Sequence, residues 1–405
     1  MSFASADPLH AFPGSHQDDR QPVILLGRRT AFARRNGALR GVTAADLLAP
    51  VLAAVLADSG LPADDVDDVI IGNAVGGGGN VARLALLSAG LPLAVPGVTI
   101  DRQCGSGLEA IILACRLVQA GAGSLYLAGG VDSTSTAPLR AHRLSSTDGA
   151  PDFYDRVRFS PDAIGDPDMG VAAETVAAVY GIDRGRQDAF ALRSHRLAGE
   201  ARQAGAFAGE IVDVGTTTGP VSADSGPRSA LTPSLLARFP AVFAAGGTVT
   251  AGNSCGDADG AVVVVVTSRA RAAALGVAGC LAFVDAVPAG VDPNLLGIGG
   301  AAAGLKLFAR TGITAGQLGR VEFTEAFAAQ ALASLDQMAI PVERANQQGG
   351  AIALGHPYGA SGALLVLRLL SQCRTGAEAG ELSLSALSIA GGLGLAALWR
   401  WENGD

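Results

Sequence analysis

The stretch VTIDRQCGSGLEAIILACRLVQAGAGSLYLAGGVDS, residues 98–133, decides the fold of this chain. A short apolar run leads into a glycine-rich turn, which is followed by a long run with apolar residues at helical spacing and then by a second apolar run. This order predicts strand, sharp turn, helix and strand. Such alternation with short apolar strands is typical of α/β proteins, in which helices cover both faces of a sheet.

The same alternation continues on both sides of this stretch. A helix is expected over Ala44–Ser59, and AVVVVVTS (residues 261–268) has the length and composition of a buried strand. The last third of the chain repeats the theme of the first, with a glycine-rich turn that opens an apolar helix at residues 354–370 and a strand that runs into glycines at residues 384–398. We therefore predict a duplicated α/β unit.

The segment from residue 134 to residue 251 differs in character. It is richer in Pro, Asp, Arg and Ser and has few strand-like runs, so we interpret it as an insertion that forms a lid or a ligand-holding subdomain. The predicted division is a flexible tail at residues 1–20, a first half at residues 21–133 plus 252–278, the insertion at 134–251, and a second half at 279–405.

Composition excludes several classes of protein. Only 16% of the 405 residues are charged and 49% are hydrophobic, which fits a compact globular protein. The formal charge of −8 argues against a nucleic-acid partner, which would need a basic surface. The five cysteines lack disulfide or metal spacing, the N-terminus has no apolar core of a signal peptide, and no run is long enough for a membrane helix. We expect no metal and a cytoplasmic location.

Two residues lie in glycine-rich turns before helices, a position that favours a catalytic role. Cys104, in DRQCGSGLEA, precedes a helix, where free N–H groups and the helix dipole favour a thiolate and can hold an oxyanion. His356, in GGAIALGHPYGASGA, has a similar place and is a candidate base for a cysteine elsewhere. The alternative interpretations are a small buried cysteine and a structural imidazole.

Six blocks carry a resemblance to a known family. They are DRQCGSGLEA (101–110), GGVDSTSTAP (129–138), MGVAAETVAAVYGIDRGRQDAFALRSH (169–195), GTVTAGN (247–253), TEAFAAQ (324–330) and GGAIALGHPYGASGA (349–363). In sequence and in order they resemble the blocks of the thiolases, the acyl-CoA C-acyltransferases. The resemblance extends from about residue 22 to residue 400.

The resemblance implies a fold and a reaction. It implies five layers, α/β/α/β/α, made of two similar halves, with coenzyme A held by the loop domain inserted in the first half. Cys104 would attack an acyl-CoA and become acylated, His356 would activate it, and the backbone N–H groups of Cys104 and Ala390 would form an oxyanion hole. Coenzyme A and acyl-CoA would be substrates, without a permanently bound cofactor, and the protein would be a homodimer, with a tetramer as the alternative.

Two positions depart from the family pattern. Ser388, in SIAGGLG, stands where the family has a second cysteine that shuttles a proton, and Thr324 stands where the family has an Asn that holds a water. A free thiol has a pKa of about 8.5, whereas an alcohol is a far weaker acid, so Ser388 would be a poor shuttle without its own base. Acylation of Cys104 should survive both changes, while ordinary Claisen condensation is in doubt.

Five further residues align with the family's substrate-binding positions: Arg228, Ala251, Cys255, Met169 and Phe327. Cys255, in TAGNSCG, replaces a serine that contacts the pantetheine arm; it would pack there or, as an alternative, serve as a replacement thiol. Arg228 would pair with phosphate. Met169 and Phe327 would line the acyl and pantetheine channel, or they belong to the core.

Three functions remain open at this point. The leading one is acyl transfer from acyl-CoA through Cys104 to CoA or to a carbon nucleophile, that is, thiolysis of a 3-ketoacyl-CoA or Claisen condensation. The first alternative is the same scaffold with changed chemistry: decarboxylative condensation, acyl transfer to oxygen or nitrogen, or thioester hydrolysis. The second is a scaffold subunit without activity, against which the presence of both Cys104 and His356 argues.

Overall fold

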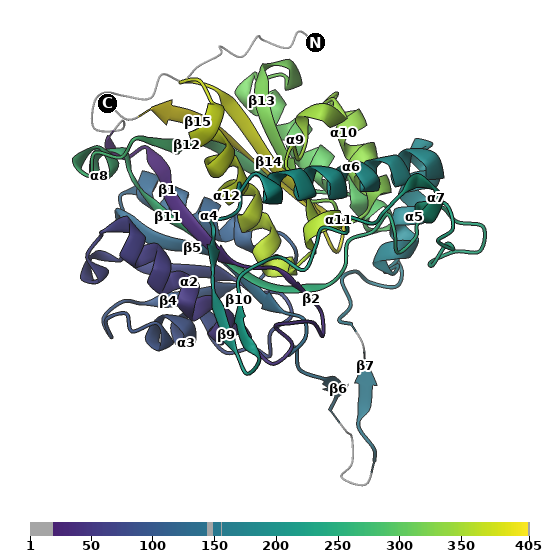
Figure 1. Ribbon diagram of the computed structural model, residues 1–405, viewed down its shortest axis with the longest axis horizontal. Helices are drawn as coiled ribbons and strands as arrows, with labels where there is room; N and C mark the ends of the chain where they lie inside the picture. The colour runs from purple at the N-terminus through teal and green to yellow at the C-terminus, as the bar shows by residue number, and fades with distance from the viewer. Residues whose placement is uncertain (1–18, 144–148, 155, 404–405) are drawn as a thin grey trace, which may run out of the picture.

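The computed structural model describes residues 19–143, 149–154 and 156–403. Eleven of the described strands form one sheet in the order β13-β14-β15-β12-β1-β11-β5-β3-β4, with β2 beside β11 and β8 beside β1. In Figure 1 the purple and blue first half lies below the green and yellow second half. The strands of this sheet are β1 (Pro22–Thr30), β2 (Ala33–Arg34), β3 (Asp68–Gly72), β4 (Gly97–Ile100), β5 (Leu125–Ser133), β8 (Ile211–Val212), β11 (Ala258–Ser268), β12 (Gly279–Gly290), β13 (Leu318–Phe323), β14 (Leu382–Ile389) and β15 (Leu393–Asn403).

The helices alternate with these strands in both halves, as the sequence pattern predicts. They are α2 (Ala44–Ser59), α3 (Val81–Ser88), α4 (Ser106–Ala120), α5 (Met169–Tyr180), α6 (Arg184–Gln203), α7 (Pro233–Leu236), α8 (Arg269–Ala274), α9 (Gly299–Thr311), α10 (Ala328–Gln337), α11 (Ala351–Leu354) and α12 (Tyr358–Gly376). Two small hairpins pair β6 (Arg140–His142) with β7 (Asp152–Tyr154) and β9 (Val214–Thr216) with β10 (Gly219–Val221).

Strand β11 shows why the first half is a buried layer. Every residue of β11 is buried, and successive side chains of a strand point to opposite faces. Val263 and Val265 pack with α2 and α3 on one face, whereas Val262 and Val264 pack with α4 and α12 on the other. The β-branched run at residues 262–266 therefore forms a strand with two apolar faces, each of which is covered by helices.

The second half repeats this arrangement. Leu387 of β14 and Trp399 of β15 pack with α4 and α12, whereas Leu384 and Leu398 of the same strands pack with α9 and α10. Helices α4 and α12 are thus a middle layer between the two halves of the sheet, which meet where β1 pairs with β12. The order of layers is α2 and α3, strands, α4 and α12, strands, α9 and α10. The predicted five-layered fold is confirmed.

Glycines let the two middle helices approach closely at their N-terminal ends. A Cβ added to Gly107 of α4 would meet the backbone of Gly359 in α12, and one added to Gly362 of α12 would lie 2.8 Å from the Leu108 nitrogen. This contact needs glycine because backbone meets backbone. It brings the start of α4, which follows Cys104, next to the start of α12.

Between β5 and β11 the chain leaves the layers. In Figure 1 the β6–β7 hairpin extends away from the body, and α5, α6 and α7 gather at one side. This segment is not a separate body, because its strand β8 pairs with β1 of the main sheet. The predicted limits of the inserted domain, 134–251, stay a prediction, and residues 1–18 of the predicted tail lie outside the described residues.

A buried ionic cluster anchors the inserted segment. Arg29 of β1 donates to both Asp224 oxygens at 2.6 and 2.9 Å and to Glu210 at 3.1 Å, and Arg368 of α12 also pairs with Glu210. The guanidinium of Arg368 lies over the Phe207 ring, 4.6 Å from its centroid. Charges from three parts of the chain thus neutralise one another inside the protein.

None of the helices in residues 19–143, 149–154 and 156–403 is long and apolar enough to cross a bilayer.

Candidate active site

Cys104 lies in the turn between β4 and α4. Gln103 has a φ of 48°, in the left-handed region, so the chain reverses sharply just before the cysteine. The Gln103 N–H donates to Asp101 Oδ1 at 2.7 Å, and Ser106 Oγ donates to the Gln103 carbonyl at 2.6 Å. Gly105 then precedes Ser106, the first residue of α4. These contacts hold Cys104 at the N-terminal end of the helix, where the sequence pattern puts it.

His356 lies in the short link between α11 and α12. Its backbone N–H donates to the Gly256 carbonyl at 2.9 Å, and Gly355 before it has a φ of 100°, a conformation that favours glycine. His356 Nδ1 lies 2.6 Å from Ser361 Oγ, in the first turn of α12, and the ring meets the Tyr358 ring edge-on. Because Ser361 engages Nδ1, Nε2 is the nitrogen left for proton transfer to a reactant.

Burial sets the protonation of both groups. It lowers the pKa of His356 to about 4, against the opposing effect of Asp257. It raises the pKa of the Cys104 thiol to about 12; N–H groups of Ala390 and Cys104 oppose the shift, and Asp132 adds to it. The helix terminus alone predicts a favoured thiolate, and this expectation was wrong because the loss of hydration outweighs the N–H groups. The resting pair is a neutral thiol and a neutral imidazole.

The low pKa of His356 predicts an unusual pH dependence of acylation. A general base acts when it is deprotonated, so a pKa of about 4 keeps His356 active well below neutral pH. The rate of acyl transfer to Cys104 should show no inflection near the ordinary histidine value of about 6.5 and should fall only below about pH 5. Single-turnover acylation measured at saturating acyl-CoA tests this, and a half-loss of rate near pH 6.5 would contradict it.

Two backbone N–H groups converge on the sulfur. Ala390 follows β14, where Gly391 and Gly392 turn the chain with φ values of 80° and 76°. The N–H groups of Ala390 and of Cys104 itself both interact with the Cys104 sulfur. Donors converging there are suited to an oxyanion on the carbon that the sulfur attacks. This is the pair that the family resemblance implies.

Ser388 does not offer a free hydroxyl to this sulfur. Its Oγ donates to the Gly297 carbonyl at 2.6 Å and accepts the Gly300 N–H at 3.0 Å, with Gln330 Nε2 at 3.4 Å. A hydroxyl has one proton to donate, and the Gly297 carbonyl takes it. Ser388 therefore caps the first turn of α9 from β14, and these contacts weigh against a role as a proton shuttle, for which the sequence already predicts it to be poorly suited.

Loss of this cap should cost stability and not acylation. In Ser388→Ala, the buried N–H of Gly300 loses its side-chain acceptor and the Gly297 carbonyl keeps only the Ser334 hydroxyl, so we expect a loss of about 1–3 kcal/mol in the free energy of unfolding. Urea unfolding monitored by circular dichroism measures it, with Ser88→Ala, at an exposed position of α3, as control. A stability equal to that of the control would contradict the prediction.

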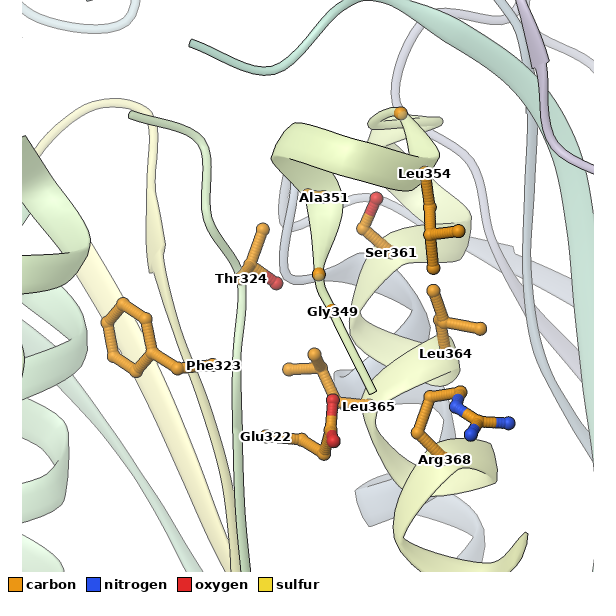
Figure 2. A pocket seen from close by; sticks show the side chains of 12 residues that line it. Glu322, Phe323, Thr324, Gly349, Ala351, Leu354, Ser361, Leu364, Leu365 and Arg368 are labelled. Atoms are coloured by element: carbon orange, nitrogen blue, oxygen red, sulfur yellow. The ribbon is translucent and has the colours of Figure 1, made fainter. Parts of the chain in front are cut away.

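Thr324 follows β13 and is buried, and its Oγ1 has no hydrogen-bond partner among the described residues. Figure 2 shows it at a small cavity with Ser361, Leu365 and Arg368. The cavity volume is about 10 Å³, roughly the space of one water. A water there would satisfy Thr324, so the predicted water-holding role fits the cavity and stays a prediction.

The five predicted substrate-binding residues do not form one cluster. Phe327 bridges to Ser254 beside Cys255, and its ring meets Phe243 edge-on at 6.0 Å. Met169 is half-buried at the start of α5. Ala251 and Arg228 are exposed, and the Arg228 backbone N–H donates to His195 Nδ1 at 3.1 Å. Of the five, only Cys255 and Phe327 lie next to His356, where the isolated bridges Ser254–Phe327 and Asp257–His356 join the two segments.

Sequence reasoning missed two residues that hold this site together. Asp132, inside the quoted block GGVDSTSTAP, accepts the Gly359 N–H at 2.6 Å and Asn73 Nδ2 at 2.7 Å, so it ties β5 to the start of α12. Ser361 orients His356 from five residues further along the chain. The sequence does carry a signal for Ser361, because a serine one helical turn into an apolar helix is unusual. For Asp132 the signal is a carboxylate inside a buried apolar strand.

Comparison with known proteins places the chain in a family. Family models described as "Thiolase, N-terminal domain" and "Thiolase, C-terminal domain" match residues 22–270 and 277–400. The chain is 43% identical over 379 residues to "Putative acetyl-CoA C-acetyltransferase YhfS" of Bacillus subtilis, covering 93% of this chain and 98% of that protein. It is 44% identical over 388 residues to "Putative acetyl-CoA C-acetyltransferase VraB" of Staphylococcus epidermidis, covering 94% and 99%.

A solved structure agrees with these relatives. The crystal structure of the Bacillus anthracis acetyl-CoA acetyltransferase superimposes with a TM-score of 0.88 at 33% identity, covering 94% of this chain and 98% of that one. The chain therefore belongs to the thiolase family. That membership confirms the prediction of an enzyme of the acyltransferase class, and neither the scaffold nor the changed-chemistry alternative is favoured.

Proposed function

We propose that the protein is an acyl-CoA C-acyltransferase in which Cys104 carries the acyl group as a thioester. One observation carries the proposal: the Cys104 sulfur meets two backbone N–H groups at the start of α4, while the neutral imidazole of His356, oriented by Ser361, stands at the start of the adjoining α12. This arrangement provides a nucleophile, a base and an oxyanion hole, the three groups that acyl transfer needs.

The first half-reaction follows from these groups. As the Cys104 sulfur attacks the thioester carbonyl, its proton passes to His356 Nε2, and the oxyanion meets the N–H groups of Cys104 and Ala390. Collapse of the intermediate breaks the carbon–sulfur bond to CoA, whose sulfur takes the proton from His356. In the second half-reaction the acyl group goes to CoA or to the α-carbon of a second acyl-CoA.

The names of the relatives support a short acyl group. Both curated relatives and the solved structure are named for acetyl-CoA, so we propose acetyl-CoA as one substrate. Coenzyme A would act as a substrate without a permanently bound cofactor. Arg228, Ala251, Met169 and Phe327 are proposed to contact the CoA moiety in the 134–251 domain and beside it. A cytoplasmic homodimer is also a proposal, with a tetramer as the alternative.

Intact-protein mass spectrometry with a panel of acyl-CoAs tests the proposal. The wild type should gain the mass of one acyl group, Cys104→Ala should gain none, and Cys280→Ser, a half-buried cysteine on β12, should behave as the wild type. Addition of CoA should then remove the adduct. A wild type that forms no adduct with any donor would refute acyl transfer through Cys104.

A further inference from the structure

The second half-reaction needs a group that removes a proton from the α-carbon of the incoming acyl-CoA. The family's usual cysteine is replaced by Ser388, whose one hydroxyl proton is donated to the Gly297 carbonyl. The phenol of Tyr358 is also engaged, because its OH donates to Asp257 Oδ1 at 2.5 Å. Neither hydroxyl is therefore free to exchange a proton with the substrate.

Cys255 lies between two segments of the same site. The Ser254–Phe327 bridge lies just before it, and its own backbone N–H donates to the Ala326 carbonyl at 3.0 Å. The next carbonyl, that of Gly256, accepts the His356 N–H at 2.9 Å. Cys255 is thus fixed by backbone contacts between the strand end that carries Thr324 to Phe327 and the turn that carries His356.

The sulfur of Cys255 also shares its surroundings with the nucleophile. It is a free thiol on a half-buried residue, and it lies close enough to Asp257 and Cys104 for their charges to interact with it. Burial, with these charges, raises the pKa of the Cys255 thiol. Its proton therefore stays on sulfur until the reaction draws it away, and the thiolate so formed is a strong base.

The remaining cysteines have no such position. Cys115 lies on α4 and Cys373 on α12, both in the apolar middle layer, and Cys280 lies near the start of β12, where it pairs with Glu402 of β15. Among the five cysteines, only Cys255 has its own N–H bonded to Ala326 while its neighbour Gly256 accepts the N–H of His356.

We propose that Cys255 is the second acid–base thiol of this enzyme, which takes the α-carbon proton in condensation and returns it in thiolysis. This inference rests on the proposed function. It assigns the proton transfer to a residue that the family resemblance would place against the pantetheine arm.

The protons balance over the condensation. After acylation His356 is neutral again, because its proton has left with CoA. The Cys255 proton passes to His356 Nε2, the Cys255 thiolate takes the α-carbon proton, and the resulting carbanion attacks the acyl carbonyl on Cys104. The new carbon–carbon bond forms as the bond from the acyl carbon to Cys104 breaks. The Cys104 sulfur then takes the proton from His356, and all three groups return to their resting forms.

The test separates acylation from α-carbon chemistry. In Cys255→Ala and Cys255→Ser we expect acyl transfer to Cys104, followed by mass spectrometry in a single turnover, to proceed within about threefold of the wild-type rate. Exchange of deuterium from D2O into the methyl group of acetyl-CoA, followed by NMR, should fall by about 100-fold or more, the usual range for loss of a general base. Cys280→Ser is the matched cysteine control and should retain both rates.

Each other outcome has one meaning. Exchange within threefold of wild type in both variants would overturn the assignment. So would parallel losses of acylation and exchange, which indicate a binding or structural role. Circular dichroism and thermal unfolding show whether each variant is folded, and Cys255→Ser, which conserves size, serves where Cys255→Ala does not fold. A wild type without any acyl adduct refutes the proposed function itself, a result distinct from a wild type that acylates while exchange is insensitive to Cys255.

Discussion

His356→Ala should lower the rate of Cys104 acylation by about a thousandfold, within the range of 10²–10⁴ that loss of a positioned base typically produces. The reason is the resting state of the pair. Because burial raises the pKa of Cys104 to about 12, almost none of the sulfur is thiolate at neutral pH. Without a base at its side, the thiol must react through that small fraction.

Single-turnover acylation by an acyl-CoA, followed by intact mass, measures this effect. His142→Ala is the matched control, since His142 is exposed on the β6–β7 hairpin. Added imidazole should restore part of the lost rate in His356→Ala, because the cavity left by the ring accepts a free base, and a merely structural defect would not respond. A variant that acylates at the wild-type rate would show that another group deprotonates Cys104.

Arg29→Ala should destabilise the protein by about 3–5 kcal/mol, the usual cost of removing one partner from a buried ion pair. The Arg29 side chain is fully buried between Glu210 and Asp224. Burial alone lowers its pKa, but the two carboxylates outweigh burial and raise it. Truncation leaves Asp224 buried without its bidentate partner, and Glu210 keeps only Arg368.

Urea unfolding followed by tryptophan fluorescence measures the loss, with Trp399 and Trp401 as probes in the adjoining half of the sheet. The control is Arg196→Ala, which removes an exposed pair with Glu200 on α6 and should change stability by less than about 1 kcal/mol. A loss for Arg29→Ala no larger than the control's would mean that water or a rearranged partner replaces the guanidinium. Cys104 acylation in folded Arg29→Ala reports whether the inserted segment also shifts.

Features set by neighbouring residues could be predicted from the sequence. Local pattern was sufficient for β11, because a run of β-branched residues with no polar interruption is stable only between two layers of helices. It was also sufficient for the turn at Cys104, since a cysteine between a strand and a helix must stand at the helix N-terminus. The blocks around Cys104 and His356 were enough to indicate the thiolase family.

Two expectations needed the folded chain. The helix terminus suggests a thiolate at Cys104, but desolvation is a property of everything packed around the sulfur, including Asp132 from β5 and the chain at Ala390. The spacing also gave no sign that the Ser388 hydroxyl is bound to Gly297 and Gly300, some ninety residues away in the sequence. Both effects depend on distance in space, which sequence order does not encode.

The sequence by itself determined the alternation of elements, the doubled α/β plan, and the two reactive turns, because these depend on residues close together along the chain. Only the tertiary structure decided which groups share the site. Glycine contacts between α4 and α12 bring the turns of Cys104 and His356 together. The bond from the Cys255 N–H to Ala326, and that from the His356 N–H to the neighbouring Gly256, hold Cys255 beside them. These contacts arise from packing between segments that are distant in the sequence. That packing removes water from the side chains and determines which groups form hydrogen bonds.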